Sequence, residues 1–256
     1  MVTFYDVLFE VSNEDRHRIL IQLVQEPMNV TRLSKTFGLS LTETSRHLSR
    51  LGEAGLTRKD GGGLYHINNF GRVLLAQLRG VEFITKHAGY FAAHSLAGIP
   101  EDLTARMGEL TNSDFVDNVM ASFHTVERLI GEAEEYILEV TDRYIMSTFP
   151  LLRDAYKRGV KLRNIQRTGF VKEAMYSEID PGVVDEIRSL SPQLWEERYL
   201  DELPFFLYMS EKEVAVLSFP RDVGEFDYYG FSSRGREARR WCQDLFQHFW
   251  EIAKTQ

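Results

Sequence analysis

Apolar residues recur at helical spacing in three short segments near the start of the chain, residues 13–25, 30–37 and 41–54. Asn13 directly precedes the first segment and Ser40 precedes the third, and both are residue types that cap helix N-termini. The pattern therefore predicts three consecutive helices, with a tight turn between the second and the third.

A pair of short strands is predicted directly after these helices. The segments 56–59 and 64–67 flank a glycine-rich turn at residues 60–63. Three helices followed by a basic hairpin are typical of a winged helix-turn-helix. We therefore expect an α+β winged helix-turn-helix domain over residues 1–80.

Beyond residue 80 the pattern changes to alternating strands and helices. Residues 70–97 carry dense apolar positions at helical spacing, and we expect a helical linker at 81–100 that joins the domains or mediates dimerisation. The remaining strand–helix–strand order predicts an α/β effector domain over 101–256, with a mixed sheet whose last two strands form a hairpin. The expected strands are residues 136–141, 160–165, 205–209 and 213–219, and the expected helices are residues 116–131, 144–158, 182–190 and 236–254.

Charge is unevenly distributed along the chain. The formal net charge is −8, but the first 80 residues hold ten Lys and Arg against eight Asp and Glu, whereas the rest hold 20 against 30. A uniformly acidic chain would argue against nucleic acid as a partner, but here a mildly basic start precedes an acidic remainder. The single cysteine, Cys242, excludes an internal disulfide and a cysteine-based zinc site. Neither a membrane-spanning run nor a signal peptide is visible, so we expect a cytoplasmic protein without a membrane partner.

Polar and cationic side chains gather on the expected third helix and on the hairpin. A helix that enters the major groove needs short polar residues near its N-terminus and cations further on, and cations on a wing reach phosphate or the minor groove. We therefore predict an interface for double-stranded DNA that comprises Thr42, Glu43, Thr44, Arg46, His47, Arg50, Arg58, Lys59 and His66. The inward face of the helix is expected to be Leu41, Ser45, Leu48 and Leu51. The alternative is a winged helix that binds proteins and whose charges are merely solvated.

Several motifs resemble one family of regulators. Residues 39–51 and 54–56 look like the helix-turn-helix core of archaeal winged-helix regulators. The segments 96–110, 224–231 (GEFDYYGF) and 241–250 resemble archaeal transcriptional regulators that carry the methanogenesis regulatory protein middle domain. This resemblance implies a regulator that binds promoter DNA, a homodimer, and an effector domain whose ligand is unassigned.

The stretch 136–167 resembles half of a phospholipase D-like unit, a unit that recurs as a sensor domain in archaeal sugar-responsive regulators. The catalytic form needs a histidine followed two positions later by a lysine, and none of the seven histidines is followed in this way. The resemblance therefore implies a binding module without phosphodiesterase chemistry. We expect no enzyme activity and no cofactor.

Ligands bind open α/β sheets in the crevice at the ends of the strands. The polar and aromatic residues expected there form the candidate effector pocket, namely Asp142, Arg143, Tyr144, Arg167, Asp227 and Tyr228. In the alternative, Arg143 and Asp227 form a structural ion pair and Tyr228 lies in the core. Two interpretations of the whole chain also stay open, an enzyme with a winged-helix targeting module and a protein-interaction scaffold.

Overall fold

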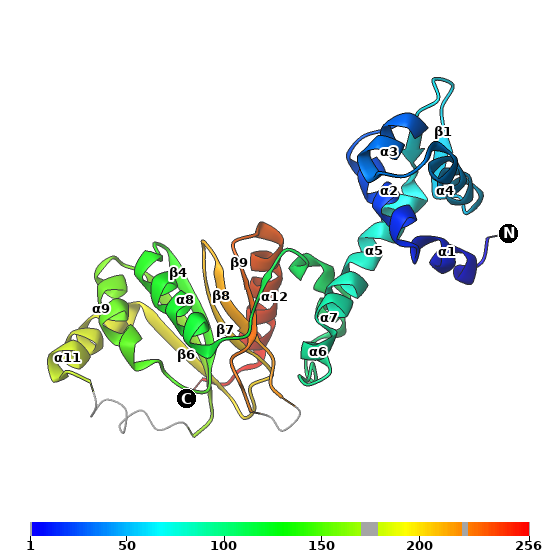
Figure 1. Cartoon of the computed structure of the whole chain (residues 1–256). Coiled ribbons are helices and arrows are strands. Elements are labelled where there is room, and N and C mark those ends of the chain that lie inside the picture. The colour runs from blue at the N-terminus through cyan, green and yellow to red at the C-terminus, as the bar shows by residue number, and fades with distance from the viewer. Residues whose placement is uncertain (1, 170–178, 222–224, 256) are drawn as a thin grey trace. The chain divides into compact units, whose positions relative to one another are not determined.

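The computed structural model describes residues 2–169, 179–221 and 225–255, and the chain divides into two compact units, Met1–Arg79 and Gly80–Gln256 (Figure 1). The expected fold class is confirmed, because a helix-turn-helix region precedes an α/β unit with a large mixed sheet. Within the described residues, no helix is long and apolar enough to cross a membrane.

The first unit contains the three predicted helices and the hairpin, together with a helix that the pattern did not predict. This additional helix begins at a capping box in which Thr3 and Asp6 each accept a hydrogen bond from the other's backbone N–H. The predicted N-caps Asn13 and Ser40 are confirmed. The elements are α1 (Phe4–Val11), α2 (Glu14–Gln25), α3 (Val30–Phe37), α4 (Leu41–Glu53), β1 (Thr57–Lys59), β2 (Tyr65–Ile67) and α5 (Asn69–Lys86), which continues into the second unit.

The core of the first unit is built mostly from leucine. Leu20, Leu33, Leu48 and Leu56 are all buried and come from α2, α3, α4 and the start of the hairpin. Gly38 ends α3 with a φ of 69°, in the left-handed region that glycine adopts without steric cost. The turn that places α4 after α3 therefore depends on this glycine.

In the described part of the chain, the second unit is built on a seven-stranded sheet in the order β3-β9-β8-β7-β4-β5-β6. Strands β4, β5 and β6 are parallel, and the other neighbouring pairs are antiparallel, including the predicted hairpin β7–β8. The strands are β3 (Asp114–Val116), β4 (Tyr136–Thr141), β5 (Lys161–Arg167), β6 (Trp195–Leu200), β7 (Phe206–Ser210), β8 (Val214–Ser218) and β9 (Gly230–Ser233).

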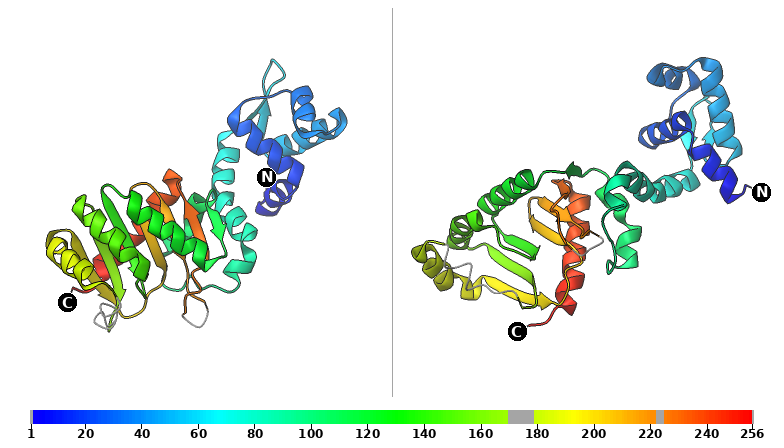
Figure 2. Two further views of the ribbon diagram at one scale, coloured as in Figure 1. Left: turned by 60° about the vertical axis from the view of Figure 1, so that its left-hand side comes forward. Right: turned by 60° about the horizontal axis from the view of Figure 1, so that its bottom comes forward.

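Helices cover both faces of this sheet (Figures 1 and 2). On one face, Val126 and Leu152 of α8 and α9 pack against strand residues such as Phe206. On the other face, Trp241 and Phe249 of α12 belong to a second core cluster. The helices of this unit are α6 (Ala88–Phe91), α7 (Glu101–Ala105), α8 (Val119–Glu132), α9 (Phe149–Lys157), α11 (Pro181–Leu190) and α12 (Arg236–Ile252), with short 3-10 turns at Met107–Leu110, Met146–Thr148 and Ser191–Gln193.

Residues 81–100 do not form the expected linker. Phe83, Tyr90 and Ile99 are buried in the core cluster of the second unit, because their side chains pack with the sheet and α12. The helical run also breaks at His87, which separates α5 from α6. This segment is therefore part of the α/β unit.

Candidate nucleic-acid interface and sheet-edge cleft

Helix α4 presents a different face from the expected one. The buried residues are Thr44, His47, Leu48 and Leu51, and the exposed residues include Leu41, Thr42, Ser45, Arg46 and Ser49. The inward assignment of Leu41 and Ser45 and the outward assignment of His47 are therefore wrong, and Thr44, which was predicted to be in the DNA interface, is buried. Thr44 tolerates full burial because its Oγ1 donates a hydrogen bond to the Ser40 carbonyl oxygen at 2.9 Å.

His47 lies inside the unit, with 7% of its surface exposed and its Nε2 3.9 Å from the Asp15 carboxylate. Burial, with the nearby charge of Arg16, lowers the pKa of the His47 imidazole below its usual 6.5. His47 is therefore a neutral packing residue near neutral pH, and it supports α4 from within.

Two further predicted contact residues are held by partners within the unit. The Glu43 carboxylate accepts hydrogen bonds from the Ser40 N–H at 3.0 Å and the Ser40 hydroxyl at 2.7 Å, which lowers the pKa of Glu43. Arg50 donates from Nη2 and Nε to the Glu10 carboxylate, at 2.6 and 3.0 Å, and lies over the Phe9 ring. Both side chains therefore have structural partners at the two ends of α4.

The exposed α4 face, defined as Leu41, Thr42, Ser45, Arg46 and Ser49, borders a shallow hollow with Val30 and Thr31 of α3. Hydroxyl groups and apolar carbon dominate this hollow. Arg46 is its cation, and among the described residues it has no ion-pair partner. A guanidinium without a carboxylate partner is available to an external acceptor.

The hairpin carries two cationic side chains and one histidine that is hydrogen-bonded to a neighbouring carboxylate. Arg58 and Lys59 of β1 are exposed and have no ion-pair partner in the described ranges, although the Lys59 Nζ lies 5.5 Å from the centre of the Tyr65 ring. His66, paired with Arg58 across the hairpin, has its Nε2 2.7 Å from the Asp60 carboxylate. Asp60 thus holds His66 at the turn, while the two cations project from β1.

The second unit has a cleft of about 780 Å³ at the carboxyl ends of the parallel strands. Asp142 follows β4, Arg167 ends β5 and Leu200 ends β6, and all three line the cleft. The cleft is also lined by Ser95, Ala97, Gly98, Glu202, Leu203, Pro204, Pro220, Arg221, Glu225, Phe226 and Phe249. Two of the six predicted effector residues, Asp142 and Arg167, are therefore brought together here.

Three of the predicted residues form a cluster beside this cleft. Tyr228 Oη donates a hydrogen bond to the Asp142 carboxylate at 3.1 Å, and the Arg143 guanidinium lies 4.7 Å from the centre of the Tyr228 ring. Tyr228 is buried, as the alternative expected. The expected Arg143–Asp227 ion pair is wrong, because Arg143 instead lies 3.6 Å from Asp142.

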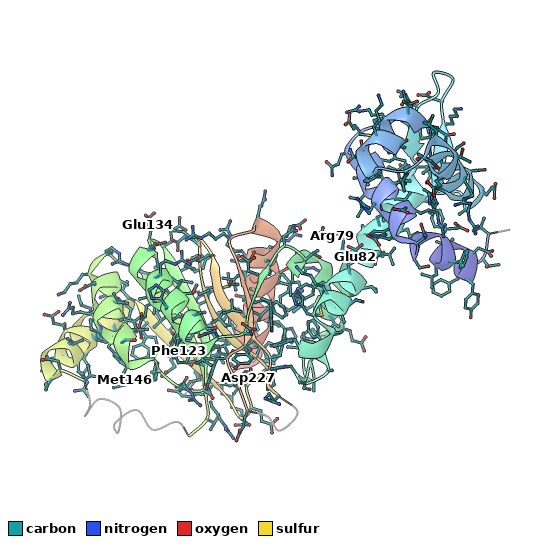
Figure 3. All side chains as sticks on the ribbon, viewed as in Figure 1. Arg79, Glu82, Phe123, Glu134, Met146 and Asp227 are labelled. Atoms are coloured by element: carbon teal, nitrogen blue, oxygen red, sulfur yellow. The ribbon has the colours of Figure 1, made fainter. Side chains whose placement is uncertain are left out.

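Asp227 has a partner that the sequence did not suggest. His94 Nε2 lies 3.1 Å from both Asp227 carboxylate oxygens, and His94 Nδ1 lies 2.8 Å from the Tyr90 carbonyl oxygen. Asp227 is labelled in Figure 3. The Arg221 guanidinium is 3.8 Å from the same carboxylate. His94 and Asp227 are 133 residues apart, so no motif spacing could have joined them. The pair ties the segment after α6 to the chain beside the cleft.

Tyr144 belongs to a separate polar group on the β5–β6 side of the sheet. Its hydroxyl donates to the Glu197 carboxylate at 3.2 Å and accepts from Asn164 Nδ2 at 3.0 Å. Tyr144 does not line the sheet-edge cleft. Its position at the end of β4 was expected, but its partners lie on neighbouring strands.

Comparison with known proteins places a family match on the first unit. Residues 13–59 match the family described as "Bacterial regulatory protein, arsR family", a region that spans α2, α3, α4 and β1. No curated protein sequence matches the chain. The family match supports a DNA-binding transcription regulator with a winged helix-turn-helix.

Solved structures are similar at low identity. The archaeal chromatin protein TrmBL2, whose structure is described as showing a novel mode of DNA binding, matches over 94% of both chains with 17% identity and a TM-score of 0.44. Nuc from Salmonella typhimurium, a phospholipase D family member, matches 56% of this chain and 96% of its own, with 10% identity and a TM-score of 0.37. The methyltransferase CalO1 matches 79% of this chain and 64% of its own, with 15% identity and a TM-score of 0.28. The resemblance of the second unit to methanogenesis regulators and phospholipase D-like sensors stays a prediction.

Proposed function

We propose that the chain is a transcription regulator that binds promoter DNA as a homodimer and responds to a small effector bound in the sheet-edge cleft. The observation that carries the proposal is the state of the cations in the first unit. Arg16, Arg32 and Arg50 are each paired with a carboxylate, whereas Arg46 on α4 and the two hairpin cations are not. Unpaired cations on a helix-turn-helix are the groups that DNA attracts.

In this proposal the exposed α4 face enters the major groove, where Arg46 contacts base edges. Arg58 and Lys59 contact phosphates or the minor groove from the hairpin. Arg50 acts as a positioning residue, because its guanidinium is held by Glu10. Thr42 and Ser45 supply hydroxyl groups near the start of the helix.

The dimer is supported by exposed apolar side chains on α1 and α5. Phe4, Tyr5 and Phe9 of α1 and Val73 of α5 are largely exposed. Apolar patches on a soluble protein commonly mark an interaction surface. A second copy of the same unit is the partner that the proposal assigns to them.

The cleft is supported as an effector site by its place and its lining. It lies at the carboxyl ends of parallel strands, and its volume of about 780 Å³ is within the range of small-molecule pockets. We propose that the cleft binds its ligand without turnover. Asp142, Arg167 and Arg221 would hold polar groups of the ligand, while Phe226 and Phe249 would cover its apolar parts.

The first test is selection of duplexes from a randomised library by the full-length protein at near-physiological salt. We expect an inverted repeat, and we expect Arg46→Ala to weaken binding to the selected duplex at least about tenfold, as loss of a base contact does. Arg188→Ala, which removes the same charge from α11 of the second unit, is the matched control and should retain affinity. If Arg46→Ala binds as tightly as the control, the winged helix serves protein contacts instead.

A further inference from the structure

The start of α4 carries an exposed leucine where a polar residue would be less costly in water. Leu41 is the first residue of the helix and is 54% exposed, whereas Leu48 and Leu51 on the opposite side are buried. Val30 and Thr31 of α3 border the same hollow, so Leu41 forms part of an apolar patch. The exposed α4 face therefore has an apolar end at Leu41 and a cationic position at Arg46.

This arrangement matches specific groups in the major groove. The thymine 5-methyl is the apolar group that base edges present there, and guanine offers two acceptors to an arginine fork. The acidic side chain next to the patch is fixed at the helix N-cap, because the Glu43 carboxylate accepts hydrogen bonds from the Ser40 hydroxyl and N–H. The Glu43 charge stays beside Leu41, but it is offset there by the two Ser40 donors and by the positive end of the helix.

We propose that Leu41 reads a thymine methyl group and that Arg46 reads a guanine in the same half-site, an inference that rests on the proposed function. The two residues are five positions apart, which is about 7.5 Å along a helix axis. The recognised half-site therefore contains a thymine and a guanine within a few base pairs of each other.

The test replaces thymine by deoxyuridine, which lacks only the 5-methyl group, one position at a time in a duplex selected by the full-length protein. For the wild type, deoxyuridine at one thymine position should lower the affinity about fourfold, which is the effect of losing one buried methyl-sized group. Leu41→Ala should bind the thymine duplex more weakly and lose its sensitivity to deoxyuridine at that position. Because Leu41 is exposed, the variant should keep the wild-type melting temperature.

Ile21→Ala is the matched control, since Ile21 is an exposed aliphatic residue on α2 outside the hollow. It should keep the full sensitivity to deoxyuridine. If deoxyuridine at every position affects wild type and Leu41→Ala equally, while Arg46→Ala still weakens binding, the reading by Leu41 is refuted and the proposed function stands. If no duplex is selected at all, the proposed function fails and this inference fails with it.

Discussion

Glu10 joins two arginines within the first unit. Glu10 is 8% exposed, and its carboxylate accepts a hydrogen bond from Arg50 at 2.6 Å and lies 2.9 Å from Arg16 Nε. The hydrogen bond from Arg50 lowers the pKa of Glu10, so the carboxylate is ionised at neutral pH. If a neutral glutamine replaced Glu10, the positive charges of Arg16 and Arg50 would lie close together without a negative charge between them.

We expect Glu10→Gln to lower the melting temperature of the first unit by roughly 4–8 °C, the shift that about 1 kcal/mol produces in a unit of this size. Glu26→Gln is the matched control, because Glu26 pairs with Arg32 at 2.6 Å in an exposed position. An exposed pair contributes little, so this variant should shift the melting temperature by less than half as much. Calorimetry of both full-length variants measures the difference, and equal shifts would contradict the role assigned to Glu10.

His47 makes the first unit sensitive to mild acid. Its pKa is lowered in the folded protein, whereas the unfolded imidazole binds a proton near pH 6.5. As the pH falls, the imidazole of the unfolded state therefore binds a proton before that of the folded state. The free energy of unfolding is highest above pH 6.5 and declines as the pH falls from there toward the pKa of the folded protein. His87, whose pKa burial also lowers, acts in the same direction in the second unit.

We expect the wild type to lose stability between pH 7.5 and pH 5.5, and we expect His47→Gln to lose less. His124→Gln is the control, because the His124 side chain is exposed on α8. Urea unfolding followed by circular dichroism at both pH values measures the effect. A loss in His47→Gln as large as in the control variant would show that His47 is not the sensitive group.

At the scale of elements, the pairing of β8 with β9 depends on one glycine. Gly230 is the first residue of β9 and is buried, and a Cβ atom there would collide with the carbonyl group of Leu217 in β8. A side chain at this position would force the two strands apart. The edge formed by β9 and β3 would then lose its attachment to the central sheet.

We expect Gly230→Ala to destabilise the second unit by about 1–3 kcal/mol or more, as overpacking does. Gly131→Ala should do the opposite, because Gly131 lies within α8 with open space around its Cα and alanine favours helix by about 1 kcal/mol. Unfolding followed by tryptophan fluorescence reports on this unit, because Trp195, Trp241 and Trp250 all lie in it. Similar behaviour of the two variants would refute the close approach at Gly230.

The elements that the sequence predicted are those with a strong local signal. Strands β4, β7 and β8 are continuous buried runs, and such runs stand out whatever lies beside them. Strand β6 was missed because its sequence, WEERYL, is polar and it forms the edge of the sheet, and β3 and β9 are only three and four residues long. Hydrophobic patterning therefore predicts the buried central strands of a sheet but not its short or polar edge strands.

The candidate sites were predicted less well, for two physical reasons. The N-cap Ser40 showed correctly where α4 begins. The faces of α4 were assigned by placing apolar residues inside and polar residues outside, and this rule fails here because Thr44 is buried and Leu41 is exposed. The His94–Asp227 pair and the cleft depend on contacts between distant segments, which local spacing does not encode. The position of Asp142 and Arg167 was predictable because Asp142 directly follows the parallel strand β4 and Arg167 ends the parallel strand β5.

At the scale of the whole molecule, charge is divided between the two units. The first unit keeps Arg46, Arg58 and Lys59 free of carboxylate partners among its described residues, while the rest of the chain is acidic. Because Arg46 is assigned to base edges, the hairpin cations Arg58 and Lys59 give four phosphate contacts for a dimer. Since log affinity falls with log salt by about 0.9 for each phosphate contact, we expect the hairpin to contribute a slope of about −3.6 for the selected duplex if each of its cations meets one phosphate.

Replacing both hairpin cations tests this distribution directly. Arg58→Ala with Lys59→Ala removes four cations from a dimer, so the slope should become shallower by about 3–4. Sequence preference should persist, because phosphate contacts position the protein and base contacts specify the site. Arg46→Ala should instead relax the preference and change the slope by less than half as much. Affinities measured from 50 to 300 mM salt distinguish the two variants, and an unchanged slope in the hairpin variant would remove the hairpin from the DNA interface.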